Sequence, residues 1–196
     1  MMKEDGYSMA LRKIRYHEDA ILRKRAKEVS EIDDKLTQLL DDMAHTLDEV
    51  DGLGIAAPQV GVLRRVVVIS YTGEEDEDGN TPDDVDPIIY ELINPVILEQ
   101  SGSQQVEEAC LSVAGKKGLV DRPSFIKISA TNRAGEAFEL IGEGLLARAL
   151  SHEIDHLDGV LFIDKAIKVM DKDKEEPGSQ KSGKKVHARR KGKKRR

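Results

Sequence analysis

Residues 143–159 read EGLLARALSHEIDHLDG, and their apolar positions recur at intervals of three and four residues. This spacing predicts an amphipathic helix over about residues 143–157, and Gly159 is well placed to end it. The apolar positions of the stripe are Leu145, Leu146, Ala149, Leu150, Ile154 and Leu157. Leu150, Ile154 and Leu157 indicate that the helix is substantially buried.

The same helix carries His152-Glu153-Ile154-Asp155-His156. Two histidines four positions apart lie on one helical face, so their ring nitrogens can converge on one metal ion. Glu153 lies between them, where its carboxylate can reach a metal-bound water. This H-E-x-x-H pattern is typical of metal hydrolases, and a solvated or salt-bridged helix face is the alternative. Buried histidine and glutamate side chains are costly without partners, which favours the metal.

Two histidines make an incomplete site, because a catalytic metal usually takes three protein ligands and leaves one position open. Cys110 is the only cysteine of the chain, and thiolate is a strong ligand for zinc and ferrous iron. We therefore expect Cys110 to be the third ligand. The alternative is that Cys110 is a small buried apolar residue.

Residues 52–61, GLGIAAPQVG, are the other unusual stretch. Small residues at these positions let backbone and substrate approach closely. Gln59 is an uncharged amide beside Pro58, and its N–H₂ group could donate to an oxyanion. A plain turn from helix to strand also explains the glycines. The G-x-x-x-x-G-K pattern of a phosphate-binding loop is absent.

Outside these stretches the chain is expected to form one further helix and several strands. Residues 30–50 show helical spacing of apolar residues, with Ser30 and Asp33 placed as a capping box. Apolar runs predict strands at 65–71 and 88–98 (the latter one long strand or a pair), a hairpin of 126–130 with 137–140, and a short last strand at 160–163. This order indicates an α+β fold, with antiparallel strands packed around the central metal-binding helix and an N-terminal amphipathic helix.

The charge is divided unevenly along the chain. Residues 177–196 carry ten of the 31 basic residues and no acidic one, so the rest holds 21 basic and 37 acidic residues, a net charge of −16. The acid-rich residues 73–87 are expected to be a solvated loop. From residue 171 the hydrophobic pattern ends, so we expect a catalytic domain over 1–170 and a basic, disordered tail over 171–196.

Several classes of protein are excluded. No apolar run approaches the roughly 18 residues of a membrane span, and residues 1–5 lack the apolar stretch of a secretory signal. One cysteine cannot form an internal disulfide framework. These features predict a cytoplasmic protein in a reducing compartment, with no membrane partner.

Three stretches together resemble the peptide deformylase family, which is marked by G-x-G-x-A-A-P-Q, E-G-C-L-S and H-E-x-D-H motifs in that order. Here they read GLGIAAPQ at 52–59, EACLS at 108–112 and HEIDH at 152–156. The resemblance spans about residues 12–165. Three motifs in order are far more specific than H-E-x-x-H alone.

The resemblance implies a metal-dependent hydrolase that removes the N-formyl group from the N-terminal methionine of newly made polypeptides and releases formate. It implies metal ligands at Cys110, His152 and His156 and a general base at Glu153. The oxyanion would be held by the metal, the Gln59 side chain and the backbone N–H of Leu111. The remaining positions matched to substrate binding are Leu53, Gly54, Glu108, Leu145 and Ala149.

Ferrous iron is the usual native metal of the family, and zinc or nickel can substitute in many members. Some bacterial members carry a C-terminal extension that docks on the ribosome. We therefore expect, as a hypothesis, that the basic tail binds ribosomal RNA through phosphate contacts. A solvated tail or a localisation signal is the alternative.

The sequence departs from the family pattern at three positions, with Ala109 for glycine, Ala114 for a common proline and Ser151 for glutamine. These departures motivate the alternative of a catalytically impaired relative that binds peptides or ribosomes. A general zinc metallopeptidase would leave the Cys110 and Gln59 motifs unexplained. A nucleic-acid-binding module rests on the tail alone, which contains no aromatic residue for base stacking.

Overall fold

A computed structural model of the chain describes residues 9–74 and 85–172. The expected basic tail, from residue 173 on, and the greater part of the expected solvated loop over 73–87 lie outside these ranges. The mixed α+β class with antiparallel strands is confirmed. None of the helices in the described ranges has the length and apolar content needed to cross a membrane.

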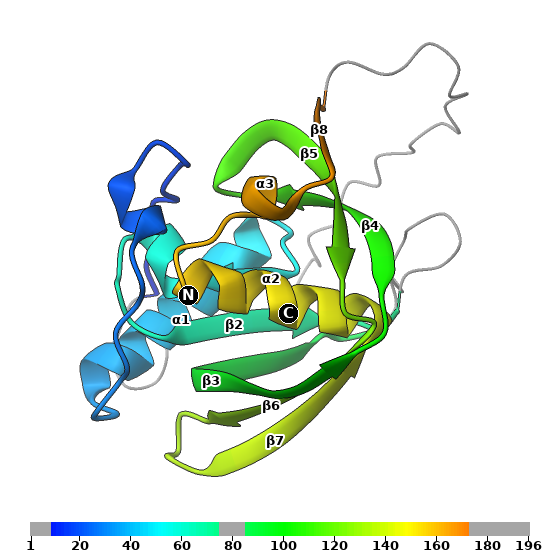
Figure 1. Cartoon of the computed structure of the whole chain (residues 1–196). Coiled ribbons are helices and arrows are strands. Elements are labelled where there is room, and N and C mark those ends of the chain that lie inside the picture. Colours follow the sequence, from blue (N-terminus) through cyan, green and yellow to red (C-terminus); the bar gives the residue numbers. More distant parts are fainter. Residues whose placement is uncertain (1–8, 75–84, 173–196) are drawn as a thin grey trace, which may run out of the picture.

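Two antiparallel sheets make up the strand framework of the described chain (Figure 1). The larger sheet has the order β1-β2-β3-β6-β7, with bounds Gly54–Ala56, Val66–Tyr71, Ile88–Ser101, Phe125–Thr131 and Ala137–Glu143. The smaller sheet has the order β4-β5-β8, with bounds Gln104–Cys110, Val113–Arg122 and Lys168–Asp171.

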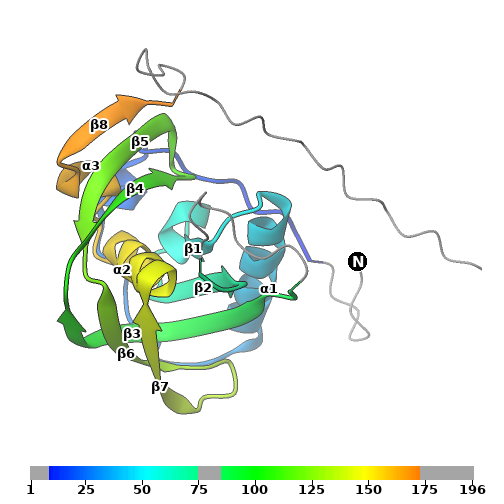
Figure 2. The same ribbon diagram turned by 90° about the vertical axis from the view of Figure 1, so that its right-hand side faces the viewer.

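Helix α2, Gly144–Leu157, lies between the two sheets (Figures 1 and 2). Its apolar side chains share one core cluster with residues of the larger sheet, among them Leu92, Ile126 and Ile128. The sequence predicts a buried helix over 143–157, and ten of the fourteen residues of α2 are buried. The helix that carries both histidines is therefore enclosed by protein, and its polar groups need partners inside the fold.

Strand β2 is covered on both faces. Val67 and Ile69 pack with α2, whereas Val66 and Val68 pack with α1, Asp34–Glu49. Successive side chains of a strand point to opposite faces, so a strand between two helices needs apolar residues at every position. The uninterrupted apolar run of this segment follows from that placement.

The prediction of a short strand at 160–163 is wrong. The chain forms a short helix there, α3, Phe162–Lys165, which follows Leu161. Asp164 accepts a hydrogen bond from the Leu161 backbone N–H (2.8 Å) and pairs with Arg23. Phe162 is buried in a third core cluster under the smaller sheet. A short apolar run suits a strand and a buried helical turn equally, and the Asp164 cap decides for the turn.

Other boundaries also differ from expectation. Helix α1 begins at Asp34 and is capped by Asp33, whose carboxylate accepts from the Leu36 N–H (2.8 Å), so the expected capping by Ser30 is wrong. Residues 88–101 form one long strand, and β6 and β7 form the expected hairpin. The sequence did not predict β4, β5 or β8. The expected domain boundary after residue 170 falls inside β8.

Candidate metal centre and active site

Three side chains of the predicted metal site meet at one point. Cys110 ends β4, and His152 and His156 lie one turn apart on α2. One ligand atom from each lies within 4.8 Å of the others, and Cys110 Sγ is 3.2 Å from His156 Nε2. The backbone N–H of Ser112 also donates to the Cys110 sulfur at 3.4 Å, which fixes its position.

A buried cluster of charged groups, here called the Glu108–Arg122 bracket, orients His152. Glu108 Oε2 lies 2.9 Å from His152 Nδ1, which leaves Nε2 as the ring nitrogen for a metal. Arg122 donates to both oxygens of Glu108 (2.7 and 2.9 Å) and to Asp155 Oδ2 (2.5 Å). Glu108 and Arg122 are 5% and 3% exposed, so their ion pair is buried.

The bracket explains the electrostatics around His152. Burial opposes ionisation of Glu108, but hydrogen bonds with His152 and Arg122 outweigh it and lower its pKa to about 2. Burial likewise disfavours protonated His152, but hydrogen bonds with Cys110 and Glu108 and the charge of Glu153 raise its pKa to about 10. A ring that binds a proton this strongly lies in a negative environment, which also suits a metal cation.

Glu153 is buried beside the three proposed ligand side chains. It is 4% exposed, and its Oε2 atom has no hydrogen-bond partner within residues 9–74 and 85–172. Burial raises its pKa to about 7, because desolvation outweighs the attraction of protonated His152. A buried polar atom without a partner is costly, so Glu153 fits a site in which water or a polar substrate supplies one.

Gln59 faces the site with its amide nitrogen. It belongs to the 3₁₀ turn η2, Ala57–Val60, and its Oε1 accepts from the Ala56 N–H at 2.7 Å. This bond turns Nε2 toward Ser112 Oγ (3.3 Å) and Cys110 Sγ (3.6 Å). The predicted donor is therefore oriented by its own loop, with the N–H₂ group toward the metal ligands.

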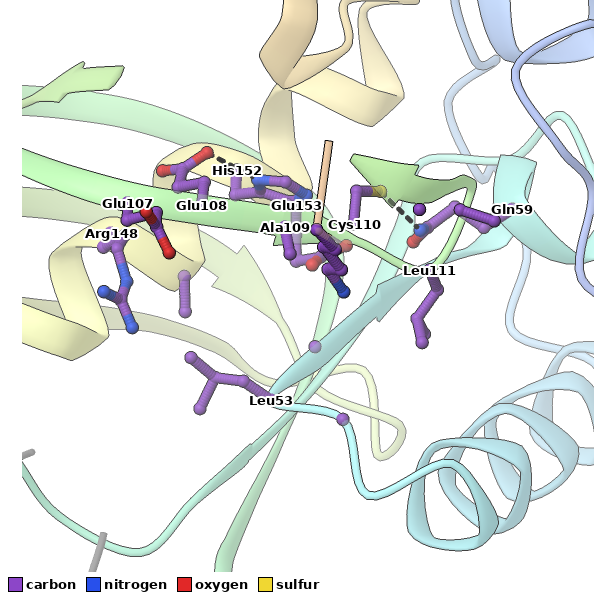
Figure 3. Close-up of a pocket in the computed structure, with 16 residues that line it drawn as sticks. Leu53, Gln59, Glu107, Glu108, Ala109, Cys110, Leu111, Arg148, His152 and Glu153 are labelled. Carbon is purple, nitrogen blue, oxygen red and sulfur yellow. Dashed lines mark hydrogen bonds and ion pairs between the residues drawn. The ribbon is translucent and has the colours of Figure 1, made fainter. Parts of the chain in front are cut away.

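These groups open into a pocket of about 460 Å³ (Figure 3). The predicted residues Leu53, Gly54, Gln59, Glu108, Cys110, Leu111, Ala149, His152 and Glu153 all line it. Two predicted residues lie off the wall: His156 is 1% exposed behind the other ligands, and Leu145 is buried one turn before Ala149. Arg148, Glu107 and Lys172 add charged side chains to the lining, and no motif in the sequence points to them.

The three departures from the family pattern leave the ligands in place. Ser151 is buried, and its hydroxyl donates to the Ala147 carbonyl of the preceding turn (2.8 Å), so it remains within its own helix. Ala109 and Ala114 are exposed and line the pocket.

A Cys-His-His ligand set with a buried glutamate beside it, at the wall of a pocket, defines a metal-dependent hydrolase. Comparison with known proteins identifies its family. The Polypeptide deformylase family model matches residues 11–172. The chain belongs to the peptide deformylase family and is a hydrolase of that class.

Individual relatives agree with this assignment. The chain is 51% identical over 160 residues to a peptide deformylase of Caldicellulosiruptor bescii, covering 82% of this chain and 88% of the relative. For one of Alkaliphilus metalliredigens the identity is 48%, covering 82% and 99%.

Solved structures agree as well. A peptide deformylase from Legionella pneumophila matches with 43% identity and a TM-score of 0.69, covering 80% of this chain and 86% of that one. A Met-Ala-Ser-bound peptide deformylase from Acinetobacter baumannii matches with 33% identity and a TM-score of 0.72, covering 81% and 99%. The alternative of a catalytically impaired binding protein finds no support in these matches.

Proposed function

We propose that the protein removes the formyl group from the N-terminal methionine of newly made polypeptides, with the residue roles given below. One observation carries the proposal: the three ligand atoms of Cys110, His152 and His156 lie within 4.8 Å of one another, beside a pocket that Glu153 and Gln59 also line. The proposed metal ligands, the general base Glu153 and the amide donor Gln59 therefore all surround the same pocket.

A divalent metal held by Cys110, His152 and His156 would polarise the formyl carbonyl and activate a water molecule. The donor set fits such an ion, because one thiolate and two imidazoles suit ferrous iron, zinc and nickel. We assign Fe²⁺ as the native metal, following the family resemblance, with Zn²⁺ or Ni²⁺ able to replace it.

Glu153 moves the proton in this scheme. Its carboxylate takes a proton from the attacking water and hands it to the nitrogen of the leaving methionine, so that formate and a free amine result. Burial raises the pKa of this carboxyl above its ordinary value, which makes the carboxylate a better proton acceptor for the attacking water.

The Gln59 amide and the backbone N–H of Leu111 hold the oxyanion that develops on the formyl oxygen. The bond from Ala56 N–H to Gln59 Oε1 keeps the amide nitrogen directed toward the site before substrate arrives. Donors that are already oriented need no reorganisation during reaction, which is the main source of such stabilisation.

The methionine side chain would lie in the pocket against Leu53, Gly54 and Ala149, with Leu145 supporting Ala149 from the turn before. Leu53 and Ala149 line the pocket with apolar surface, which suits an unbranched thioether chain. Glu108 lines the pocket and would bind substrate from its wall, while its bonds with Arg122 and His152 hold its carboxylate in place.

The test compares the protein with Glu153→Ala, using formate release from a formyl-methionyl tripeptide. We expect turnover to fall by about 10²–10⁴ while one metal per chain is retained. Glu49→Ala, at the exposed end of α1, is the matched control and should behave as the parent. Parent-like activity of Glu153→Ala would refute the mechanism. Cleavage of internal peptide bonds without formate release would point to a general metallopeptidase.

We also propose that the basic tail, 171–196 by the sequence, associates with ribosomal RNA, as befits a cytoplasmic enzyme acting on nascent chains. The last twenty residues of this tail, 177–196, carry ten basic residues and no acidic one, which favours phosphate contacts. Deleting 177–196 should leave peptide kinetics unchanged and weaken co-sedimentation with ribosomes at low salt. A tail of equal length with its Lys and Arg replaced by Gln is the control for length, and parent-like co-sedimentation of both variants would exclude this role.

A further inference from the structure

Helix α2 does not cap its own N-terminus. Its N-cap residue Glu143 makes no side-chain cap hydrogen bond, and its first turn contains no acidic residue. The first backbone N–H groups of a helix have no partner inside it. The Gly144 N–H donates to the Ser124 carbonyl (3.1 Å), and the Leu145 N–H donates to Glu74 Oε2 (2.8 Å). A carboxylate 71 residues earlier in the sequence thus completes this helix.

The other oxygen of Glu74 is held as well. The hydroxyl of Tyr71, the last residue of β2, donates to Glu74 Oε1 at 2.7 Å. Burial and the bond to Glu74 raise the pKa of Tyr71 to about 12, so its hydroxyl remains a donor at neutral pH. The carboxylate therefore joins the end of β2 to the beginning of α2, with its charge at the positive end of the helix dipole.

Gly144 leaves space for this carboxylate. A Cβ atom at Gly144 would lie 2.1 Å from Glu74 Oε2, and the residue adopts a φ of +46°, which side chains rarely tolerate. The absence of a side chain at Gly144, the first residue of α2, therefore allows the Glu74 carboxylate to approach the helix.

The two halves of α2 are held by different groups. His152 and Asp155, in the C-terminal half, contact the Glu108–Arg122 bracket. The N-terminal half supplies Arg148 and Ala149 to the pocket wall, one turn beyond Leu145. A change at Glu74 should therefore reach the pocket wall without moving the metal ligands.

We propose that Glu74 is a positioning residue for substrate binding: by capping the first turn of α2, it sets the place of Ala149 and Arg148 in the pocket wall. This role deepens the proposed deformylase function and rests on it for its kinetic consequence. The structural part, the cap itself, stands on the contacts of Glu74 with Leu145, Tyr71 and Gly144.

The test uses Glu74→Ala, Glu74→Gln and the control Asp86→Ala, which removes an exposed acid from the same connection. For a formyl-methionyl tripeptide, Glu74→Ala should raise KM about fivefold, the size of a lost helix cap expressed as an equilibrium constant, with kcat within about twofold. Glu74→Gln keeps an acceptor oxygen and should restore most of the loss. Asp86→Ala should match the parent.

Two further readouts separate positioning from general disorder. The visible spectrum of the cobalt-substituted protein should be unchanged in Glu74→Ala, because its ligands are held elsewhere. Amide hydrogen exchange should quicken at residues 145–149 and stay unchanged at 152–156. An unchanged KM, or unchanged exchange at 145–149, would overturn the proposal, as would a shifted cobalt spectrum with falling kcat.

The outcome is distinct from that of the proposed function. If the parent releases no formate with metal bound, the deformylase function fails, whereas the exchange measurement still decides whether Glu74 caps α2.

Discussion

Gly54 is the residue whose replacement most directly tests the placement of Glu153. A Cβ atom at Gly54 would lie 2.8 Å from both Cγ and Oε1 of Glu153. Non-bonded carbon atoms prefer about 3.5–4.0 Å, so one partner must yield by about 0.7–1.2 Å. Gly54 belongs to β1 and pairs with Ile69 of the buried β2, so its backbone is fixed. The side chain of Glu153 must therefore move in Gly54→Ala.

The expected cost follows from that displacement. Misplacing a catalytic group by about 1 Å costs roughly 10²-fold in rate, equivalent to about 2.7 kcal/mol in the activation free energy. Gly54→Ala should therefore lose about a hundredfold in kcat. The three atoms nearest to the added methyl group all belong to Glu153 and none to a proposed ligand, so one metal per chain should remain.

Formate release from a formyl-methionyl tripeptide measures kcat, and metal analysis with circular dichroism checks that the variant is folded and loaded. The matched control is Gly115→Ala in the same pocket, where a Cβ atom would meet nothing within 4 Å. Its φ of +71° predicts a small loss of stability with activity within about threefold of the parent. If loaded Gly54→Ala is also within threefold, the position assigned to Glu153 is not the reactive one.

Three further outcomes are expected. Gln59→Ala should lower kcat/KM by about 10²–10³ with the metal retained, because one oxyanion donor is lost; a loss below tenfold in steady-state kinetics would exclude that role. Arg122→Met leaves the buried Glu108 carboxylate without its main partner, and urea unfolding should show a loss of about 3–5 kcal/mol. Leu150→Ala removes a side chain of α2 that is 0% exposed in the core and should cost about 2–5 kcal/mol in the same measurement. A value under 1 kcal/mol for either variant would contradict the packing described.

Local spacing predicted the parts of the site that lie on one helix. His152, Glu153 and His156 are fixed relative to one another once the segment is helical, because the helical repeat sets their angles. Gln59 was also predicted, because its loop combines small residues with a proline. These predictions required no knowledge of how the sheets pair.

The bracket around His152 could not be predicted in the same way. Arg122 and Glu108 meet because β4 and β5 pair with a particular register, in which Glu108 lies opposite Gly118. Residues 113–122 contain two lysines and two glycines, which obscure the alternating pattern of a strand. The signal that remained was a glutamate two positions before the ligand cysteine, with its partner fixed only by tertiary pairing.

The contact between Glu74 and Leu145 at the N-terminus of α2 could not be predicted from local spacing either. The sequence around residue 143 offers no Ser, Thr, Asp or Asn to start a helix, and that missing cap was the only local sign of a distant one. Its partner could not be found from spacing, because β2 carries Glu74 to the helix end through packing across the sheet. A missing local cap before a strongly periodic helix therefore indicates that another segment supplies the capping group.

The acidic side chains of the site are buried, so each of them needs a positive charge close by to remain ionised. Glu108 and Glu153 are both buried near His152, and Cys110, the proposed third ligand, would hold a metal ion as a thiolate. The ion pairs of Arg122 are with Glu108 and Asp155, so Glu153 and the cysteine depend on positive charge at the ligand position. The raised pKa of His152, about 10, shows that the surroundings of its ring favour a positive charge. A divalent cation held by the ligands would supply twice the charge of a proton on His152. The buried acids would then be stabilised, and this stabilisation would contribute to metal affinity.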